Sequence, residues 1–271
     1  MDSEIAKVLR LETEPVALIF SDEKPEGAAQ FKAGAPSCVM FMFASAARGN
    51  TAVFDRESYA CPGGGIGLGF GNAYEKFPGG LPGFCRFLST GNEKDPAGKA
   101  IGEGMKAAGA PAGFVEHFLH GERYKQTPDL ANQFVKALPI TEVPTQYVVM
   151  KPLSKVDPAQ EEPVSVTFLV NADQLSALVI FANYDRPGLE NVAIPYAAAC
   201  QVMGILSYKE AQSENPRCLI GLTDISARKN LKSQGCADKL TFTVPFRRLR
   251  QMESGVEGSF LQGNTWAGVV E

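Results

Sequence analysis

The cysteines are the residues of this chain that most clearly suggest a chemical function, namely the binding of a metal or cofactor. No two of the cysteines form the C-x-x-C pair typical of structural zinc sites and ferredoxin-type clusters. Distant cysteines can still converge in a fold, and thiolates from Cys38, Cys61 and Cys200 suit a soft metal ion or an iron–sulfur cluster. The alternative is that these thiols are small buried apolar groups. The six cysteines are Cys38, Cys61, Cys85, Cys200, Cys218 and Cys236.

A glycine-rich stretch follows Cys61 directly and reads CPGGGIGLGFG over residues 61–71. Glycines leave backbone N–H groups unshielded, so a ligand can approach them. Neither the Rossmann nor the P-loop phosphate motif fits the stretch. Each glycine costs about 1 kcal/mol relative to alanine in a helix, so we expect an irregular loop. We predict that a small cofactor binds Cys61 and the glycine backbone; the alternative is that the glycines only permit close packing. The predicted cofactor-binding residues are Cys61, Gly63, Gly64, Gly65, Gly67 and Gly69.

Two other hypotheses explain the same residues differently. In the first, the chain is an enzyme with Cys61 as nucleophile, which needs a nearby base. The only histidines are His117 and His120, three apart on a predicted helix, where a solvated helix end is the simpler interpretation. No nucleophile-elbow motif supports acyl transfer, so catalytic residues stay unassigned. In the second, the chain is a structural or interaction protein without a ligand.

Strands and helices alternate along the chain, and they must position these residues. The pattern predicts an α+β fold, a mixed sheet with helices packed on it. The predicted strands are 16–20, 147–150, 164–170, 218–222 and 240–244, and the predicted helices are 36–47, 95–108, 111–120, 172–183, 195–206 and 224–230.

The order of elements suggests two αβ halves, each with a strand, a Pro-initiated apolar helix carrying a cysteine, and a later cysteine before a Gly-containing apolar segment. We predict an N-terminal half over residues 1–138, a Pro-rich joint over 139–163 and a C-terminal half over 164–271. An ancient duplication and a chance similarity of two αβ units both explain this order.

Composition excludes several classes of protein. The chain has 271 residues and a formal net charge of -4, without the basic surplus that phosphate contacts require, so we expect no nucleic-acid partner. No run of about 18 apolar residues is present, so we expect no membrane partner. The first residues, MDSEIAKVLRLETE, do not resemble a secretory signal, and the cysteines indicate a reducing cytoplasm. A homodimer is only the statistical expectation.

Several of these features together resemble a known family. They are the strand after Pro15, the Cys38 helix ending in AARG, the stretch CPGG followed by GLG, and the later pair Ala199-Cys200. The chain resembles the domain-of-unknown-function 169 family, found chiefly among anaerobic prokaryotes, from about residue 9 to about residue 252. The resemblance implies a shared fold and a shared site, but no established reaction or ligand. An anaerobic setting suits oxygen-sensitive metal–sulfur centres.

Our leading hypothesis is therefore a cytoplasmic protein that binds a small cofactor or metal centre, an iron–sulfur cluster or haem, around Cys61. Cys38 and Cys200 would line the same cavity. A cluster or haem can hold and deliver electrons, so the expected role is redox or accessory.

Overall fold

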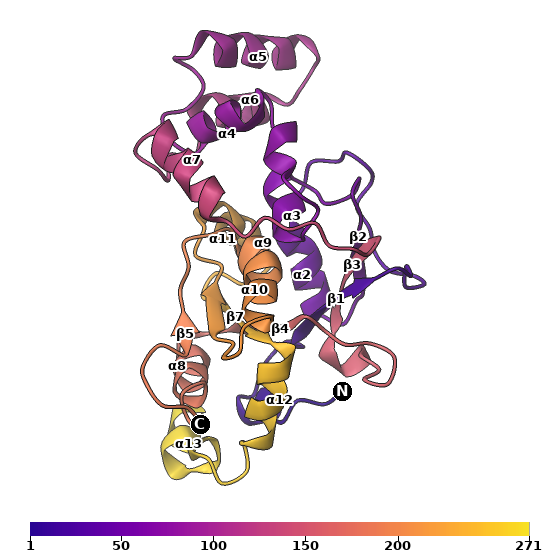
Figure 1. The fold of residues 1–271 in the computed structure, drawn as a ribbon, viewed down its shortest axis with the longest axis vertical. Helices are drawn as coiled ribbons and strands as arrows, with labels where there is room; N and C mark the ends of the chain where they lie inside the picture. The colour runs from indigo at the N-terminus through magenta and orange to yellow at the C-terminus, as the bar shows by residue number, and fades with distance from the viewer. Residues whose placement is uncertain (271) are drawn as a thin grey trace. The chain divides into compact units, whose positions relative to one another are not determined.

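Seven strands form one mixed sheet in the computed structural model, which describes residues 1–270 (Figure 1). Their order is β2-β3-β1-β4-β7-β6-β5, and every neighbouring pair is antiparallel except β5 with β6. The α+β class predicted from the sequence is confirmed. The strands are β1 (Val16–Ser21), β2 (Ala52–Phe54), β3 (Tyr147–Pro152), β4 (Ser165–Val170), β5 (Val192–Ala193), β6 (Cys218–Gly221) and β7 (Leu240–Pro245).

Both faces of the sheet are buried. Successive side chains of a strand point to opposite faces, so a strand can contribute to both apolar clusters. In β1, Ala17 and Ile19 belong to one apolar cluster, while Val16 and Leu18 belong to another. A strand buried on both faces is a continuous apolar run, which is why its position was predictable from the sequence.

Four helices cover the first face, and each packs its apolar side against the sheet. Ile5, Phe181, Leu249 and Trp266 pack into the cluster that contains Ala17. Two short 3₁₀ turns, Leu153–Lys155 and Phe260–Gln262, complete this side. The four helices are α1 (Glu4–Val8), α8 (Ala172–Phe181), α12 (Phe246–Ser254) and α13 (Asn264–Val270).

The second face carries the helices that hold Cys38, Cys61 and Cys200 at or near their starts. Helix α2 begins at Val39, later than the predicted Pro36, because Cys38 is extended and stands at the N-cap. The second Pro-initiated helix also begins late, at Ala199, and a π-helical turn interrupts it over Val202–Leu206. The elements on this side are α2 (Val39–Ala47), α3 (Pro62–Gly67), α9 (Ala199–Gln201), the π turn, α10 (Ser207–Ala211) and α11 (Ile225–Lys232).

The glycine-rich stretch contains the helix α3, so the expectation of an irregular loop is wrong. Pro62 occupies the first turn, where proline is well tolerated, and Cys61 caps the helix. A Cβ on Gly67 would lie 2.7 Å from the backbone carbon of Cys200, and one on Gly204 only 1.7 Å from the carbonyl oxygen of Gly67. Close packing between α3 and the π turn therefore requires glycine, and tertiary contacts override helix propensity here.

Residues Asn72–Ile140 form a second unit, which is helical in the described chain. Its core is aromatic: the rings of Tyr74 and Phe84 stack with centroids 3.6 Å apart, and Phe77 and Phe118 contact the same group. The elements are a 3₁₀ turn (Ala73–Lys76), α4 (Gly80–Phe87), α5 (Pro96–Ala107), α6 (Ala112–His120) and α7 (Pro128–Ala137).

The first unit is discontinuous in sequence, since it comprises Met1–Gly71 and Thr141–Glu271. Strands from both predicted halves, 1–138 and 164–271, lie in its single sheet. The predicted joint, 139–163, supplies β3, which pairs with β1 and β2. Long-range strand pairing rather than two separate sheets therefore organises this unit.

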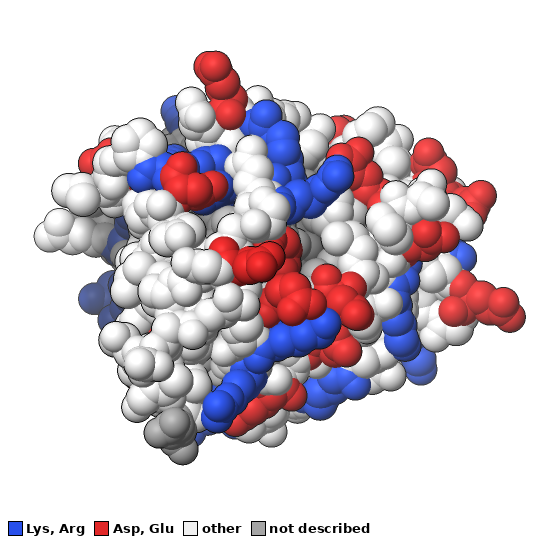
Figure 2. Space-filling model, turned by 90° about the horizontal axis from the view of Figure 1, so that it is seen from below, with Lys and Arg blue, Asp and Glu red and all other residues white. Residues whose placement is uncertain are grey.

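Charged side chains of both signs mix on the surface. On the face in Figure 2, several Asp and Glu gather near the centre, with Lys and Arg around them. Among the described helices, none has the length and apolar character needed to cross a membrane.

Candidate functional site

Three cysteines from distant parts of the sequence meet on the second face of the sheet. Cys38 is the N-cap of α2, Cys61 is the N-cap of α3, and Cys200 lies in α9. Helix α3 packs against α9 and the π turn, and α2 also contacts α9. We call Cys38, Cys61 and Cys200 the three-thiol site. The structure thus brings together the three cysteines that the sequence analysis selected.

Cys61 is the half-exposed thiol at the start of α3. Its Sγ accepts a hydrogen bond from the N–H of Gly64, with 3.3 Å between the sulfur and the nitrogen. The preceding residue, Ala60, has a φ of +73°, a left-handed conformation that costs a non-glycine residue about 1–2 kcal/mol. The N–H of Gly64 therefore fixes the position of this sulfur at the start of the helix.

Cys200 faces the same turn of α3 from the other side. Its side chain is 8% exposed, and its thiol donates to the carbonyl oxygen of Gly63 at 3.5 Å. That carbonyl and the N–H of Gly64 belong to one peptide group. The C=O and N–H of a trans peptide point in opposite directions, so the sulfurs of Cys200 and Cys61 lie at its two ends. One peptide group therefore separates the two thiols.

The pKa values of Cys38 and Cys200 are both raised. Burial raises the pKa of Cys200 well above its usual value, and the charges of Cys61 and Cys38 raise it further. Burial also raises the pKa of Cys38, partly offset by a hydrogen bond from the side chain of Asn230. At neutral pH, Cys38 and Cys200 are thiols.

The glycine amides that the sequence analysis proposed as ligand contacts are largely used within the fold. The N–H of Gly64 donates to the sulfur of Cys61, and that of Gly65 donates to the Cys61 carbonyl at 2.9 Å. The N–H of Gly69 donates to Ile66 at 3.0 Å, and Gly67 packs against Cys200. A ligand at Cys61 would therefore meet the thiol in preference to these amides.

Asp224 lies near the three-thiol site, and the sequence analysis did not select it as a site residue. Its Oδ1 accepts from the N–H of Ala199 at 2.9 Å, and its Oδ2 accepts from the N–H of Ala227 at 3.3 Å. Burial raises the pKa of this carboxyl group, and its charge raises the pKa values of Cys38 and Cys200. The only available sequence signal was its position between strand and helix.

Comparison with known proteins identifies the family. The model of domain of unknown function 169 (DUF169), described as "Uncharacterised ArCR, COG2043", matches residues 4–255. The chain belongs to this family. The predicted resemblance is confirmed, and the match includes every residue of the three-thiol site. No curated protein and no solved structure matches the chain. The DUF169 description assigns no reaction or ligand, so any function must be argued from the site.

The three-thiol site is not a preformed metal centre. Among residues 1–270, no three or more His, Cys, Asp or Glu side chains are arranged to hold a metal ion. The histidines belong to the separate helical unit, where His117 Nε2 lies 3.7 Å from Glu122 and His120 Nδ1 lies 3.5 Å from Glu93. A soft ligand would have to draw the three sulfurs together.

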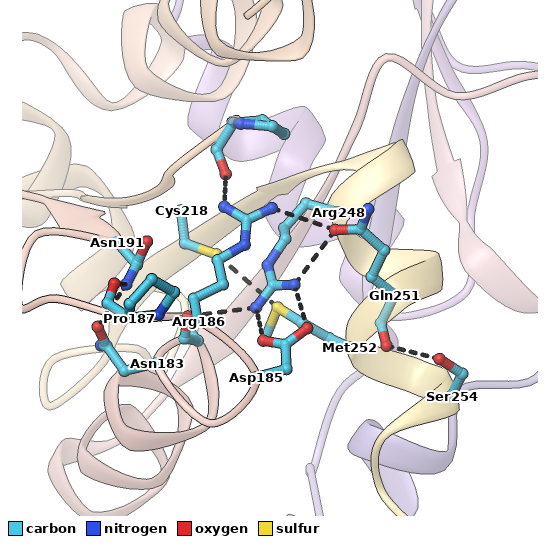
Figure 3. A network of polar contacts seen from close by, with 12 residues as sticks. Asn183, Asp185, Arg186, Pro187, Asn191, Cys218, Arg248, Gln251, Met252 and Ser254 are labelled. Atoms are coloured by element: carbon cyan, nitrogen blue, oxygen red, sulfur yellow. Dashed lines mark hydrogen bonds and ion pairs between the residues drawn. The ribbon is translucent and has the colours of Figure 1, made fainter. Parts of the chain in front are cut away.

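Cys218 lies in a different environment, on the first face of the sheet (Figure 3). Its Sγ is 3.8 Å from the sulfur of Met252, and burial raises its pKa to about 12. Nearby, the buried Arg248 makes a bidentate ion pair with Asp185 and also contacts Gln251. This network fastens the segment after α8 to α12, and it is separate from the three-thiol site.

Proposed function

We propose that this DUF169 protein binds a small thiophilic ligand, a soft metal ion or metal–sulfur centre, through Cys38, Cys61 and Cys200 in a redox or accessory role. The observation that carries the proposal is the convergence of three thiols from three separate helix starts. Sulfur donors are those that soft metals prefer. The proposal places the protein in a reducing compartment such as the cytoplasm, where thiols stay reduced.

Charge supports a cationic ligand. Each thiol must lose its proton to bind a metal, and the pKa of Cys200 is raised by burial and by the charges of Cys61 and Cys38. Without a cation, three thiolates in this place repel one another. A cation among the sulfurs reverses the balance, because each thiolate is attracted to it. Binding would therefore release protons and draw the thiols together.

The residues of the site would have distinct tasks. Cys38 and Cys61 are the partly exposed members, so a ligand from solvent would meet these two sulfurs before that of Cys200. The N–H of Gly64 holds the sulfur of Cys61 in place through a hydrogen bond. Cys200 would bind the ligand from the buried side of the site. The hydrogen bonds of these sulfurs would then influence the reduction potential of a bound metal–sulfur centre.

Anaerobic purification of the full chain tests the proposal. We expect a metal or an absorbing centre to co-purify, or Fe²⁺, Zn²⁺ or Cd²⁺ to bind the reduced protein. Cys61→Ala and Cys200→Ala should abolish binding. Cys236→Ala removes a half-buried thiol outside the site and should bind like the wild type. A colourless, metal-free protein that takes up none of these ions would overturn the proposal; a haem spectrum would instead identify haem as the cofactor.

The half-exposed sulfur of Cys61 with its N–H donor also supports a second candidate, a nucleophilic cysteine. This candidate predicts covalent labelling of Cys61 by an electrophile at a rate that falls as the thiol becomes protonated. It also predicts that Cys38→Ala and Cys200→Ala keep that rate, because burial keeps these two thiols protonated and neither can serve as the base. A metal site predicts instead that bound metal protects Cys61 from the electrophile.

A further inference from the structure

Strand β5 lies at one edge of the sheet, and its only neighbour among the described strands is β6 (Figure 1). The N–H of Cys218 in β6 donates to the carbonyl oxygen of Asn191 at 3.0 Å, and the register pairs Val192 with Cys218. Successive residues of a strand direct their N–H and C=O groups to alternate sides. Asn191 and Ala193 therefore face β6, whereas the backbone groups of Val192 and Ile194 point away from the sheet.

The outer side of β5 is an open strand edge. Within residues 1–270, no hydrogen bond uses the outward N–H or C=O groups of Val192 and Ile194. Such an edge is a template for pairing with another chain, and many proteins protect it with lysine or proline. Pro195 does not protect this edge, because by the same alternation it lies on the β6 side. The edge is therefore able to accept a further strand.

Large apolar side chains are exposed in the segment that contains β5. Leu189 is 94% exposed and Ile194 is 66% exposed, and both Tyr184 and Tyr196 are exposed as well. Exposed apolar side chains that gather in one place mark interaction sites, whereas scattered single ones do not. Residues 184–196 therefore have the character of an interface.

The charges on the two flanks of β5 indicate which partner fits. Residues 184–190 include Asp185, Arg186 and Glu190, whereas residues 191–206 contain no charged side chain. Two copies related by a two-fold axis pair antiparallel, so the charged flank of each copy lies against the uncharged flank of the other. Like charges then do not face each other, which would destabilise the pairing. A second copy of this chain therefore complements the edge.

We propose that two copies of this chain form a homodimer by antiparallel pairing of their β5 strands, which joins the two seven-stranded sheets into one. The two-fold axis lies at Ala193, so Val192 of each copy is opposite Ile194 of the other. Both residues direct their backbone groups outwards, and each such pair exchanges two N–H···O bonds, so the pairing makes about four. This inference goes beyond the proposed function and does not depend on it.

Side-chain packing favours the same register. Val192 and Ile194 are two residues apart, so their side chains lie on the same face of the strand. In the dimer the β-branched side chains of both copies form one apolar cluster across the axis, and cross-strand pairs of this kind stabilise sheets. Val192 already packs against the apolar cluster on the first face, so the new contacts extend an existing core.

Sedimentation equilibrium of the reduced full chain measures the dissociation constant of the dimer. We expect the wild type to reach twice the mass of the 29.1 kDa chain. Val192→Pro removes an N–H that takes no part in the pairing with β6, and Ile194→Lys places a charge in the apolar cluster. Each change is present twice in the dimer, so each should raise the dissociation constant at least about 100-fold.

Ile225→Lys is the matched control. Ile225 is 63% exposed, much like Ile194, but it begins α11 on the second face of the sheet. Helix α11 packs against α2, and α2 covers β3, which lies near the opposite edge of the sheet. This variant should dimerise like the wild type. Circular dichroism and urea unfolding verify that all three variants fold.

A cysteine placed at the axis tests the register. Ala193 lies opposite Ala193 of the second copy in a non-hydrogen-bonded pair, where Cα atoms are about 4.5 Å apart, within the range of a disulfide. Ala193→Cys should therefore cross-link when glutathione disulfide accepts the two electrons and protons of the two thiols. Ile194→Cys should cross-link far more slowly, because its counterpart lies diagonally across the pair, about 7–8 Å away. Mass spectrometry of the linked peptides distinguishes this bond from any bond of the native cysteines.

The outcomes decide the proposal without reference to any ligand. A wild type that stays monomeric at its highest soluble concentration would overturn it. A dimer that Val192→Pro and Ile194→Lys leave unchanged must use another surface, which would overturn it equally. A dimer that cross-links through Ile194→Cys in preference to Ala193→Cys would refute the register centred on Ala193.

Discussion

The contact between α3 and the π turn can be tested by adding one carbon atom. In Gly204→Ala the new Cβ would lie 1.7 Å from the carbonyl oxygen of Gly67 and 2.8 Å from its carbonyl carbon. Favourable contacts between heavy atoms begin near 3.5 Å, so the backbone segments would have to separate by more than about 1 Å. Backbone atoms cannot rotate away as a flexible side chain can, so the two elements must move apart.

The expected loss of stability is about 2 kcal/mol or more. Overpacking a well-packed contact costs about 1–3 kcal/mol and sometimes more, and this clash is between backbone and Cβ. Replacing glycine by alanine in a helix returns up to about 1 kcal/mol. The matched control is Gly268→Ala in α13, where a Cβ has no atom within 4 Å and where alanine should stabilise slightly.

Urea unfolding followed by circular dichroism measures both variants against the wild type. A second readout is the alkylation rate of Cys200, which should rise in Gly204→Ala because separation of α3 from the π turn uncovers this buried thiol. If Gly204→Ala unfolds within about 0.5 kcal/mol of the wild type and Cys200 stays protected, then α3 and the π turn do not pack as described.

Three further predictions concern charge, thiol reactivity and strain. Arg248 lowers the pKa of Asp185, so the ion pair contributes stability above the unfolded carboxyl pKa of about 3.9, and this contribution is lost as pH falls through the folded pKa. Asp185→Asn should therefore cost about 2 kcal/mol at pH 7, because Arg248 is 1% exposed while the carboxylate is 43% exposed, and progressively less as the pH falls through the folded pKa of Asp185. A loss in urea unfolding that does not shrink on acidification would refute this. Cys218, whose pKa is raised to about 12, should resist iodoacetamide in the native protein at pH 8 and react only after unfolding, as mass spectrometry of the labelled peptides would show. Ala60→Gly should stabilise the fold by about 0.5 kcal/mol, since relief of left-handed strain exceeds the entropic cost of glycine, and a loss of stability in urea unfolding would contradict the strain argument.

The parts of the fold that follow from local pattern were predictable. The strand β1 is a continuous apolar run between polar residues, and the helix predicted over 172–183 begins where the side chain of Asn171 accepts from the N–H of Gln174. The helix predicted over 224–230 likewise has its N-cap at Asp224. In each case the deciding interaction lies within a few residues of sequence, so the residue types alone carry the information.

The parts that failed depend on contacts between distant residues. Helix α3 forms despite its glycines because Gly67 must approach the backbone of Cys200, which lies 133 positions later in the sequence. A single sequence contains no signal for that approach, and helix propensity alone indicates the opposite. Asp224 was recognisable as a cap, but its position beside Cys200 depends on how α9 meets α11. Only the three-dimensional packing brings this carboxylate to the thiols.

The contact between α3 and the π turn lies next to Cys61 and Cys200, so ligand binding can be tested through protein stability without an activity assay. The glycines that let α3 approach the π turn are the residues that bring Cys61 and Cys200 to the two ends of one peptide group. A ligand that binds both sulfurs therefore holds the two elements together, and it must stabilise the folded state. At a free concentration 100 times its dissociation constant, the gain is about 2.7 kcal/mol. That gain should restore most of the stability lost in Gly204→Ala, and it should be absent when Cys61 is replaced by alanine. A metal that stabilises the Cys61→Ala variant as much as the wild type must bind elsewhere on the chain.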